Sequence, residues 1–159
     1  LGRQVAATGK QLALPLLTIA AVVALAFIMN YSGQTATLGL VVAGTGSAFP
    51  FFGTVLGWLG VFLTGSDTSA NALFGTLQVV TATQLGLSPV LMAAANSAGG
   101  VMGKMISLQS IAVAAAATGM PRQEESNLLR FTLKHSVFFT ILMGLLTLMF
   151  AYVVPQWVR

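Results

Sequence analysis

The chain has 159 residues, of which 56% are hydrophobic and only 6% are charged, and its mean hydropathy is +0.88. Soluble domains contain about a quarter charged residues, and so short a chain cannot hide this much apolar surface from water, so lipid is the expected solvent. The lack of cysteine excludes disulfides and thiolate metal sites, the single histidine excludes a histidine cluster, and the net charge of +4 sits at terminal and loop positions, typical of topology-setting charge and not of nucleic-acid binding.

The first predicted element is a membrane-spanning helix at 12–30. This segment approaches the roughly 20 apolar residues that a bilayer crossing requires, and Arg3 and Lys10 precede it. The residues before it are too polar to be a secretory signal peptide. Because the chain begins with Leu and not Met, we expect it to be the C-terminal part of a larger membrane protein whose N-terminal part is missing.

The next apolar stretch is interrupted too often to be one smooth helix. Its helix breakers are Gly44, Gly46, Pro50, Gly53, Gly57 and Gly60. This spacing predicts a short piece at 36–48, a bend at 47–50 and a helix at 51–64. Whether 36–48 crosses the membrane stays open at this stage.

A polar motif at 65–71 separates the helix at 51–64 from a second predicted helix at 72–85. The second helix is too short to span comfortably. Asn71, Gly75 and Gln78 share one face of it, and such a small, polar face suits burial against protein. The region 36–85 is therefore predicted to contain a re-entrant hairpin with 65–71 as its tip.

The remainder predicts two further spans. Residues 90–119 form a helix that is expected to be interrupted at 96–100, and residues 135–154 form the last span after a hydrophilic helix at 122–134. The predicted fold class is an all-α membrane protein, a multi-span helical bundle with a re-entrant hairpin and discontinuous helices. Residues 1–159 then form part of a single polytopic transmembrane domain.

The two predicted breaks are the candidate binding site. Irregular backbone at membrane depth persists only where it lines a cavity or is buried in protein, and half-helix starts present N–H groups that attract anions. Both breaks carry side chains that can bind a carboxylate or hydroxyl. The candidate substrate-binding residues are Ser66, Thr68, Ser69 and Asn71 at the first break, Asn96 and Ser97 at the second, and Lys104 beyond it.

Asp67 and Lys104 are the isolated charges of the apolar body. Asp67 is the only acidic residue in the first 123 positions. Because an ionisable group inside a bilayer is costly, Asp67 is the candidate proton-coupling residue, or it coordinates a cation that travels with the substrate; alternatively it simply caps a helix. Lys104 pairs with a substrate carboxylate or with Asp67, or it snorkels towards an interface.

Two sequence blocks resemble signatures of the bacterial L-lactate permease family. The first is residues 62–74, FLTGSDTSANALF, and the second is residues 93–107, AAANSAGGVMGKMIS, followed by QSIAVA at 109–114. Their order and spacing match, as does the QVV run at 78–80, and the resemblance extends over the whole chain as about the last third of such a permease. The departures are Ala70, Ala98 and Leu108, where the family more often has Ser, Ser or Thr, and Pro.

The resemblance implies a multi-pass carrier of the cell inner membrane. Such a carrier imports L-lactate, often with glycolate or D-lactate, by proton symport, and is similar to the broader ion-transporter group with its re-entrant hairpins. The expected partners are the lipid bilayer, a small monocarboxylate and the missing N-terminal part of the same transporter. No cofactor is expected beyond the proton as coupling ion, and no nucleic acid.

Two other classes of function remain open from sequence. A non-transporting membrane subunit would dock partner helices through its glycine faces and would tolerate changes at Asp67. A passive anion channel would equilibrate solute without uphill accumulation. An enzyme is least expected, because no nucleophile–base pair and no metal-ligand set is visible.

Overall fold

The computed structural model describes the backbone of residues 2–158, and it leaves aside the side chains of residues 3, 5, 11, 12, 14–16, 18, 19, 22, 116 and 122. Across 2–158 the chain is helical and contains no strand. Its helices are α1 (Gly2–Tyr31), α2 (Gln34–Ala43), α3 (Phe49–Thr64), α4 (Asp67–Gln84), α5 (Pro89–Lys104), α6 (Leu108–Thr118) and α7 (Arg122–Tyr152), with 3-10 turns at Gly46–Ala48 and Pro155–Trp157. This is an all-α membrane protein, as the composition predicts.

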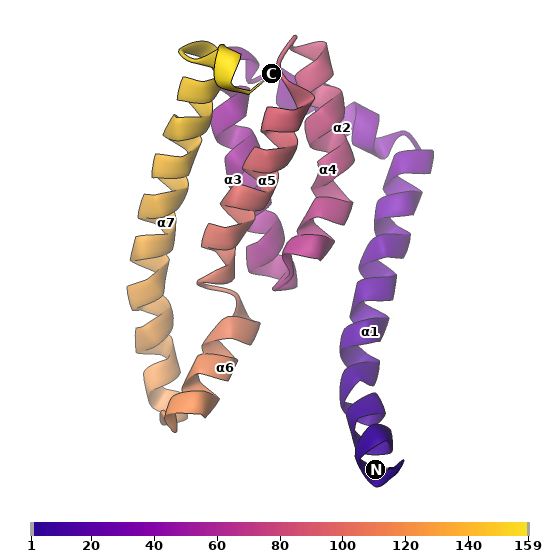
Figure 1. Ribbon diagram of the computed structural model, residues 1–159, viewed down its shortest axis with the longest axis vertical. Helices are drawn as coiled ribbons and strands as arrows, with labels where there is room; N and C mark the ends of the chain where they lie inside the picture. Colours follow the sequence, from indigo (N-terminus) through magenta and orange to yellow (C-terminus); the bar gives the residue numbers. More distant parts are fainter. Residues whose placement is uncertain (1, 159) are drawn as a thin grey trace.

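Helices α3, α4 and α5 form the centre of the bundle. The most extensive contact joins α3 and α5; α7 packs against both of them, and α1 and α2 pack against α4. Figure 1 shows α7 and α1 at opposite edges, with the N-terminal half of α1 extending away from the other helices. Most large side chains of α7 are exposed, which fits a helix that faces lipid.

The break between α3 and α4 is shorter than the predicted tip at 65–71. Gly65 ends α3 in a left-handed conformation (φ 68°), which glycine adopts without steric cost, and its N–H donates to the Val61 carbonyl. Ser66 then caps α4, because its hydroxyl accepts from the Ser69 N–H at 3.3 Å. Helix α4 therefore begins at Asp67 and not at the predicted residue 72, and it extends to Gln84.

The predicted interruption at 96–100 is wrong, because α5 continues through these residues without a break. Gly99 and Gly100 allow close approach of a neighbour here: a Cβ on Gly99 would overlap the Thr54 carbonyl of α3. The break instead follows Lys104. Ser107 caps α6 by accepting from the Ser110 N–H at 3.3 Å, and α5 and α6 meet at a bend of 40°.

Two other boundaries also differ from prediction. The piece expected at 36–48 divides into α2 and the 3-10 turn at Gly46–Ala48, which leads directly into α3. The hydrophilic helix at 122–134 and the span at 135–154 are one continuous helix of 31 residues, α7. Nothing between them ends a helix, since neither glycine nor proline occurs from residue 122 to 143.

By length and composition, two helical segments of the described chain are long enough and apolar enough to cross a membrane: Gly46–Thr64 and Gln123–Tyr152. The bent pair of Pro89–Lys104 and Leu108–Ala115 is a third if it counts as one span. In Figure 1 the α3–α4 turn lies near the middle of α7. The re-entrant hairpin in 36–85 stays a prediction. The crossings at 12–30, 90–119 and 135–154 stay predictions, and several residues of 12–30 lie outside the described side chains.

Candidate functional site

The two helix breaks of the central bundle lie against each other. The Lys104 ammonium, at the end of α5, donates to the Gly65 carbonyl in the α3–α4 turn. A Cβ on Gly65 would come within 2.7 Å of the side-chain oxygen of Gln109, in the first turn of α6. Both breaks accordingly appear at the same height in Figure 1. This contact brings the N-termini of α4 and α6 to one place.

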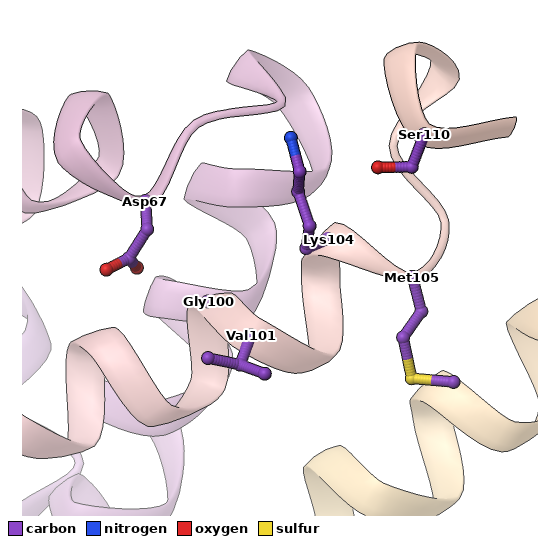
Figure 2. Close-up of a pocket in the computed structure, with 6 residues that line it drawn as sticks. All are labelled: Asp67, Gly100, Val101, Lys104, Met105 and Ser110. Carbon is purple, nitrogen blue, oxygen red and sulfur yellow. The ribbon is translucent and has the colours of Figure 1, made fainter. Parts of the chain in front are cut away.

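A hollow of about 460 Å³ opens where these breaks meet. It is lined by residues from α4, from the last turn of α5, from the α5–α6 break and from α6: Asp67, Gly100, Val101, Lys104, Met105 and Ser110 (Figure 2). Its volume falls in the range of about 300–1,000 Å³ that is typical of small-molecule sites. The isolated acid and the isolated base of the apolar body therefore line one cavity.

Asp67 and Lys104 share the hollow without forming an ion pair, and none is present among the described side chains. Figure 2 shows the two side chains pointing in different directions, the ammonium towards the α3–α4 turn. An ammonium group has three N–H donors, so the bond to the Gly65 carbonyl leaves donors for a further acceptor. The arrangement leaves space between the two charges.

The two oxygens of Asp67 have unequal surroundings. Oδ2 accepts from the Asn71 amide at 3.0 Å and from the Ser97 hydroxyl at 3.1 Å. Oδ1 is buried and has no hydrogen-bond partner. A Cβ on Gly100 would overlap Oδ1, so this oxygen lies directly against the backbone of α5. Gly100 is the reason that the carboxylate fits between the two helices.

Amide side chains continue this network away from Asp67. The Asn71 amide also donates to Ser97 at 2.7 Å, and Asn96 donates to Asn71 Oδ1 at 2.8 Å. Gln78 donates to Asn96 Oδ1 at 3.0 Å and to the Gly53 carbonyl at 2.7 Å. Gln78 and Asn96 are both fully buried. The network thus joins α4, α5 and α3 by side-chain hydrogen bonds.

The sequence-derived candidates separate into three groups. Asp67, Asn71, Asn96 and Ser97 are brought together in the network, and Lys104 lies at the hollow beside them. Ser66 and Ser69 form the cap of α4, and Thr68 is exposed. Roles for all of these residues in binding or coupling stay predictions.

Sequence reasoning missed Gln78, Gly100 and Ser110 as members of the site. The sequence did offer a signal for Gln78, because this residue shares a helical face with Asn71. Ser110 lies one turn after the cap residue Ser107, but a helix predicted to be continuous there did not mark it as part of a helix start.

A profile of the L-lactate permease family matches residues 2–154. The chain belongs to the L-lactate permease family. It is 61% identical over 146 residues to the L-lactate permease of Salmonella typhi, covering 92% of this chain and 26% of that protein. It is 62% identical over 139 residues to the glycolate permease of Escherichia coli K12, covering 87% and 25% of the two chains.

A third relative is the L-lactate permease of Bacillus subtilis, which is 57% identical over 152 residues, or 93% of this chain and 27% of that protein. The chain therefore spans about a quarter of the length of these relatives, less than the third expected from sequence. No solved structure matches it.

Proposed function

We propose that the chain is part of a secondary active carrier of the cell inner membrane. The carrier imports L-lactate and related 2-hydroxy monocarboxylates, such as glycolate and D-lactate, together with protons. The observation that carries this proposal is family membership across residues 2–154, because relatives of the chain are named L-lactate and glycolate permeases. The hollow between the two helix breaks is where the structure offers matching chemistry.

The proposed substrate contact is the side of the hollow formed by Lys104 and the start of α6. A carboxylate there meets the free donors of the Lys104 ammonium and the Ser110 hydroxyl, and the positive end of the α6 dipole favours an anion. Ser66 and Ser69 support this place by capping α4, and Asn71, Asn96 and Ser97 support it through the network behind the hollow.

The proposed proton site is Asp67. Its Oδ2 already accepts two hydrogen bonds, whereas Oδ1 has no partner. A proton bound at Oδ1 neutralises the one acidic charge of the apolar body before the site moves through the membrane. Loading and release of this proton beside the substrate would couple the two movements.

The rest of the transporter is the expected partner of this hollow. Sites of secondary carriers commonly lie between structural repeats and use discontinuous helices from each. Because the chain spans 26% of the length of the Salmonella relative, we propose that another part of the full-length protein covers the opening between α4, α5 and α6.

The test is uptake of radiolabelled L-lactate by the full-length permease in proteoliposomes, with and without an inward proton gradient. Accumulation that requires the gradient is expected. Equilibration without a gradient would instead identify a channel or uniporter, and no uptake by demonstrably folded protein would favour a non-transporting subunit.

The Asp67→Asn variant tests the coupling residue separately. Asparagine keeps the shape of aspartate but cannot exchange a proton, so gradient-driven accumulation should be lost. Exchange of internal for external L-lactate at equal pH should persist, because exchange needs no net proton release. Accumulation that survives in Asp67→Asn would contradict the coupling role of Asp67.

A further inference from the structure

The hydrogen bonds between Asp67 and Gln78 form a chain with a single direction. Gln78 donates to Asn96, Asn96 donates to Asn71, and Asn71 donates to Asp67 Oδ2, each at 2.8–3.0 Å. In each of these three bonds the donated amide hydrogen is directed towards Asp67. We call the three amides Gln78, Asn96 and Asn71 the amide relay.

A backbone carbonyl determines this direction. The Gly53 carbonyl can only accept, and it takes a hydrogen bond from Gln78 Nε2 at 2.7 Å. The same nitrogen donates to Asn96, so Asn96 must present its oxygen to Gln78 and its nitrogen to Asn71. Asn71 in turn must present its nitrogen to Asp67. Reversing any one amide would place two donors or two acceptors face to face.

The direction has a consequence for where a proton can bind. Oδ2 of Asp67 accepts hydrogen bonds from Asn71 and Ser97, so a proton on that oxygen would displace at least one of them. Oδ1 is buried without a partner. We propose that the amide relay positions Asp67 so that the transported proton binds only at Oδ1, and that Gln78 is the positioning residue that fixes the relay. This inference rests on the proposed coupling role of Asp67.

The packing around Gln78 supports a dedicated place for this side chain. Gln78 is fully buried, and a Cβ on Gly53 would come within 2.6 Å of its Oε1. Glycine at position 53 thus makes room for the amide beside the carbonyl that orients it. The sole charged side chain that α3, α5 and α6 bring to this region is Lys104, and it is bonded to the Gly65 carbonyl, so the relay supplies the groups that orient Asp67.

The alternative is that the amides only satisfy one another as a buried structural network. The two interpretations differ in what happens when Gln78 loses its donors. A structural role predicts a general loss of stability and of all transport modes. A positioning role predicts that the relay can reverse, that Asn71 can present its oxygen to Asp67, and that the proton then divides between Oδ1 and Oδ2.

The experiment compares Gln78→Met with Thr81→Val in the full-length permease in proteoliposomes. Methionine has nearly the same length as glutamine and donates no hydrogen bond. Thr81 is the matched control, because it is also fully buried on α4 and donates to the Gly39 carbonyl at 3.3 Å, outside the relay. Gln78→Glu is measured in parallel, since a carboxylic acid restores at most one of the two donors.

Three readouts are taken: gradient-driven accumulation of L-lactate, L-lactate exchange at equal pH, and the infrared band of the protonated carboxyl, identified by its absence in Asp67→Asn. In Gln78→Met, accumulation should fall about tenfold, the effect of one hydrogen bond to a charged group, while exchange persists and the band shifts. Gln78→Glu should lie between Gln78→Met and the unmodified protein. Thr81→Val should leave the ratio of accumulation to exchange and the band unchanged.

The inference is overturned if Gln78→Met retains accumulation and an unshifted band. It is also overturned if accumulation and exchange fall together in Gln78→Met and Thr81→Val, which would indicate a structural role. If Gln78→Met does not fold, Gln78→Glu decides the question. An unshifted band and full accumulation in Gln78→Glu overturn the inference, whereas reduced accumulation with intact exchange supports it. Accumulation that survives in Asp67→Asn would instead reject the proposed coupling site itself.

Discussion

The contact between α3 and α5 and the contact between α1 and α4 hold helices together by different means. In the first, a Cβ on Gly57 would overlap the backbone of Asn96, and Cβ atoms on Gly99 and Gly103 would overlap the carbonyls of Thr54 and Trp58. We call Gly57, Gly99 and Gly103 the glycine seam. In the second, the side-chain hydrogen bond between the described residues joins Asn30 to Thr76 at 3.5 Å.

The difference shows which part of the molecule can hold a site. Backbones in van der Waals contact cannot shift without separating two helices, so the glycine seam fixes α5, and with it Asn96 and Gly100, relative to α3. The contact of α1 with α4 instead includes a side-chain hydrogen bond between Asn30 and Thr76, and both side chains can take other rotamers. We therefore expect rigid support for Asp67 from α3 and α5 and adaptable packing at α1.

The largest effect is expected from a methyl group in the seam. Gly57→Ala should lower the free energy of unfolding by about 3 kcal/mol, the upper part of the range for overpacking, because the added carbon meets backbone that has no rotamer to change. Thermal unfolding of the detergent-solubilised permease measures it. Gly75→Ala is the control: its Cβ has nothing within 4 Å, and alanine should be neutral or stabilise α4 by up to about 1 kcal/mol.

The next largest effect is expected at the hollow. Lys104→Met should raise the KM for L-lactate by about tenfold to a hundredfold, the effect of a lost charge-assisted hydrogen bond, whereas Lys104→Arg should retain most of the affinity. Initial rates of uptake measure both. An unchanged KM together with a lower unfolding temperature would show that Lys104 only holds the α3–α4 turn.

A smaller effect on transport is expected at Gly100. Gly100→Ala places a methyl group on Asp67 Oδ1, so the carboxylate must turn away from α5. Accumulation should fall about tenfold, comparable to the loss of one hydrogen bond to a charged group. The ratio of accumulation to exchange in proteoliposomes measures it, and a ratio equal to that of Gly75→Ala would contradict the importance of this contact.

The smallest effect is expected at the edge. Thr76→Val removes the acceptor of the long Asn30 hydrogen bond, and Thr76 is exposed. The change in the free energy of unfolding should stay within about 0.5 kcal/mol, as for most surface positions, and uptake should not change. A loss comparable to that of Gly57→Ala would remove the distinction between the two contacts.

Local signals in the sequence were enough to place several features. The hydropathy required lipid as solvent, and the polar motif at 65–71 predicted a break between two helices, which the structure narrows to Gly65 and Ser66. The isolated charges Asp67 and Lys104, singled out in the sequence, are two of the residues that line the hollow. The two signature blocks indicated the family that the comparison with known proteins confirms.

The tertiary structure decided what the same residues do. Gly99 and Gly100 are helix breakers in isolation, but the Thr54 carbonyl fills the space beside Gly99 and the side chains of Asp67 and Val61 fill the space beside Gly100, so α5 continues through them. Asn71 and Asn96 carry amides that can bind a substrate or each other, and their partner depends on which helix packs opposite. Composition and spacing report on residues that are close to one another in the sequence, whereas the packing of α3 against α5 joins residues that are distant in the sequence. The relay from Gln78 to Asp67 depends on such packing, so it is visible only in the folded bundle.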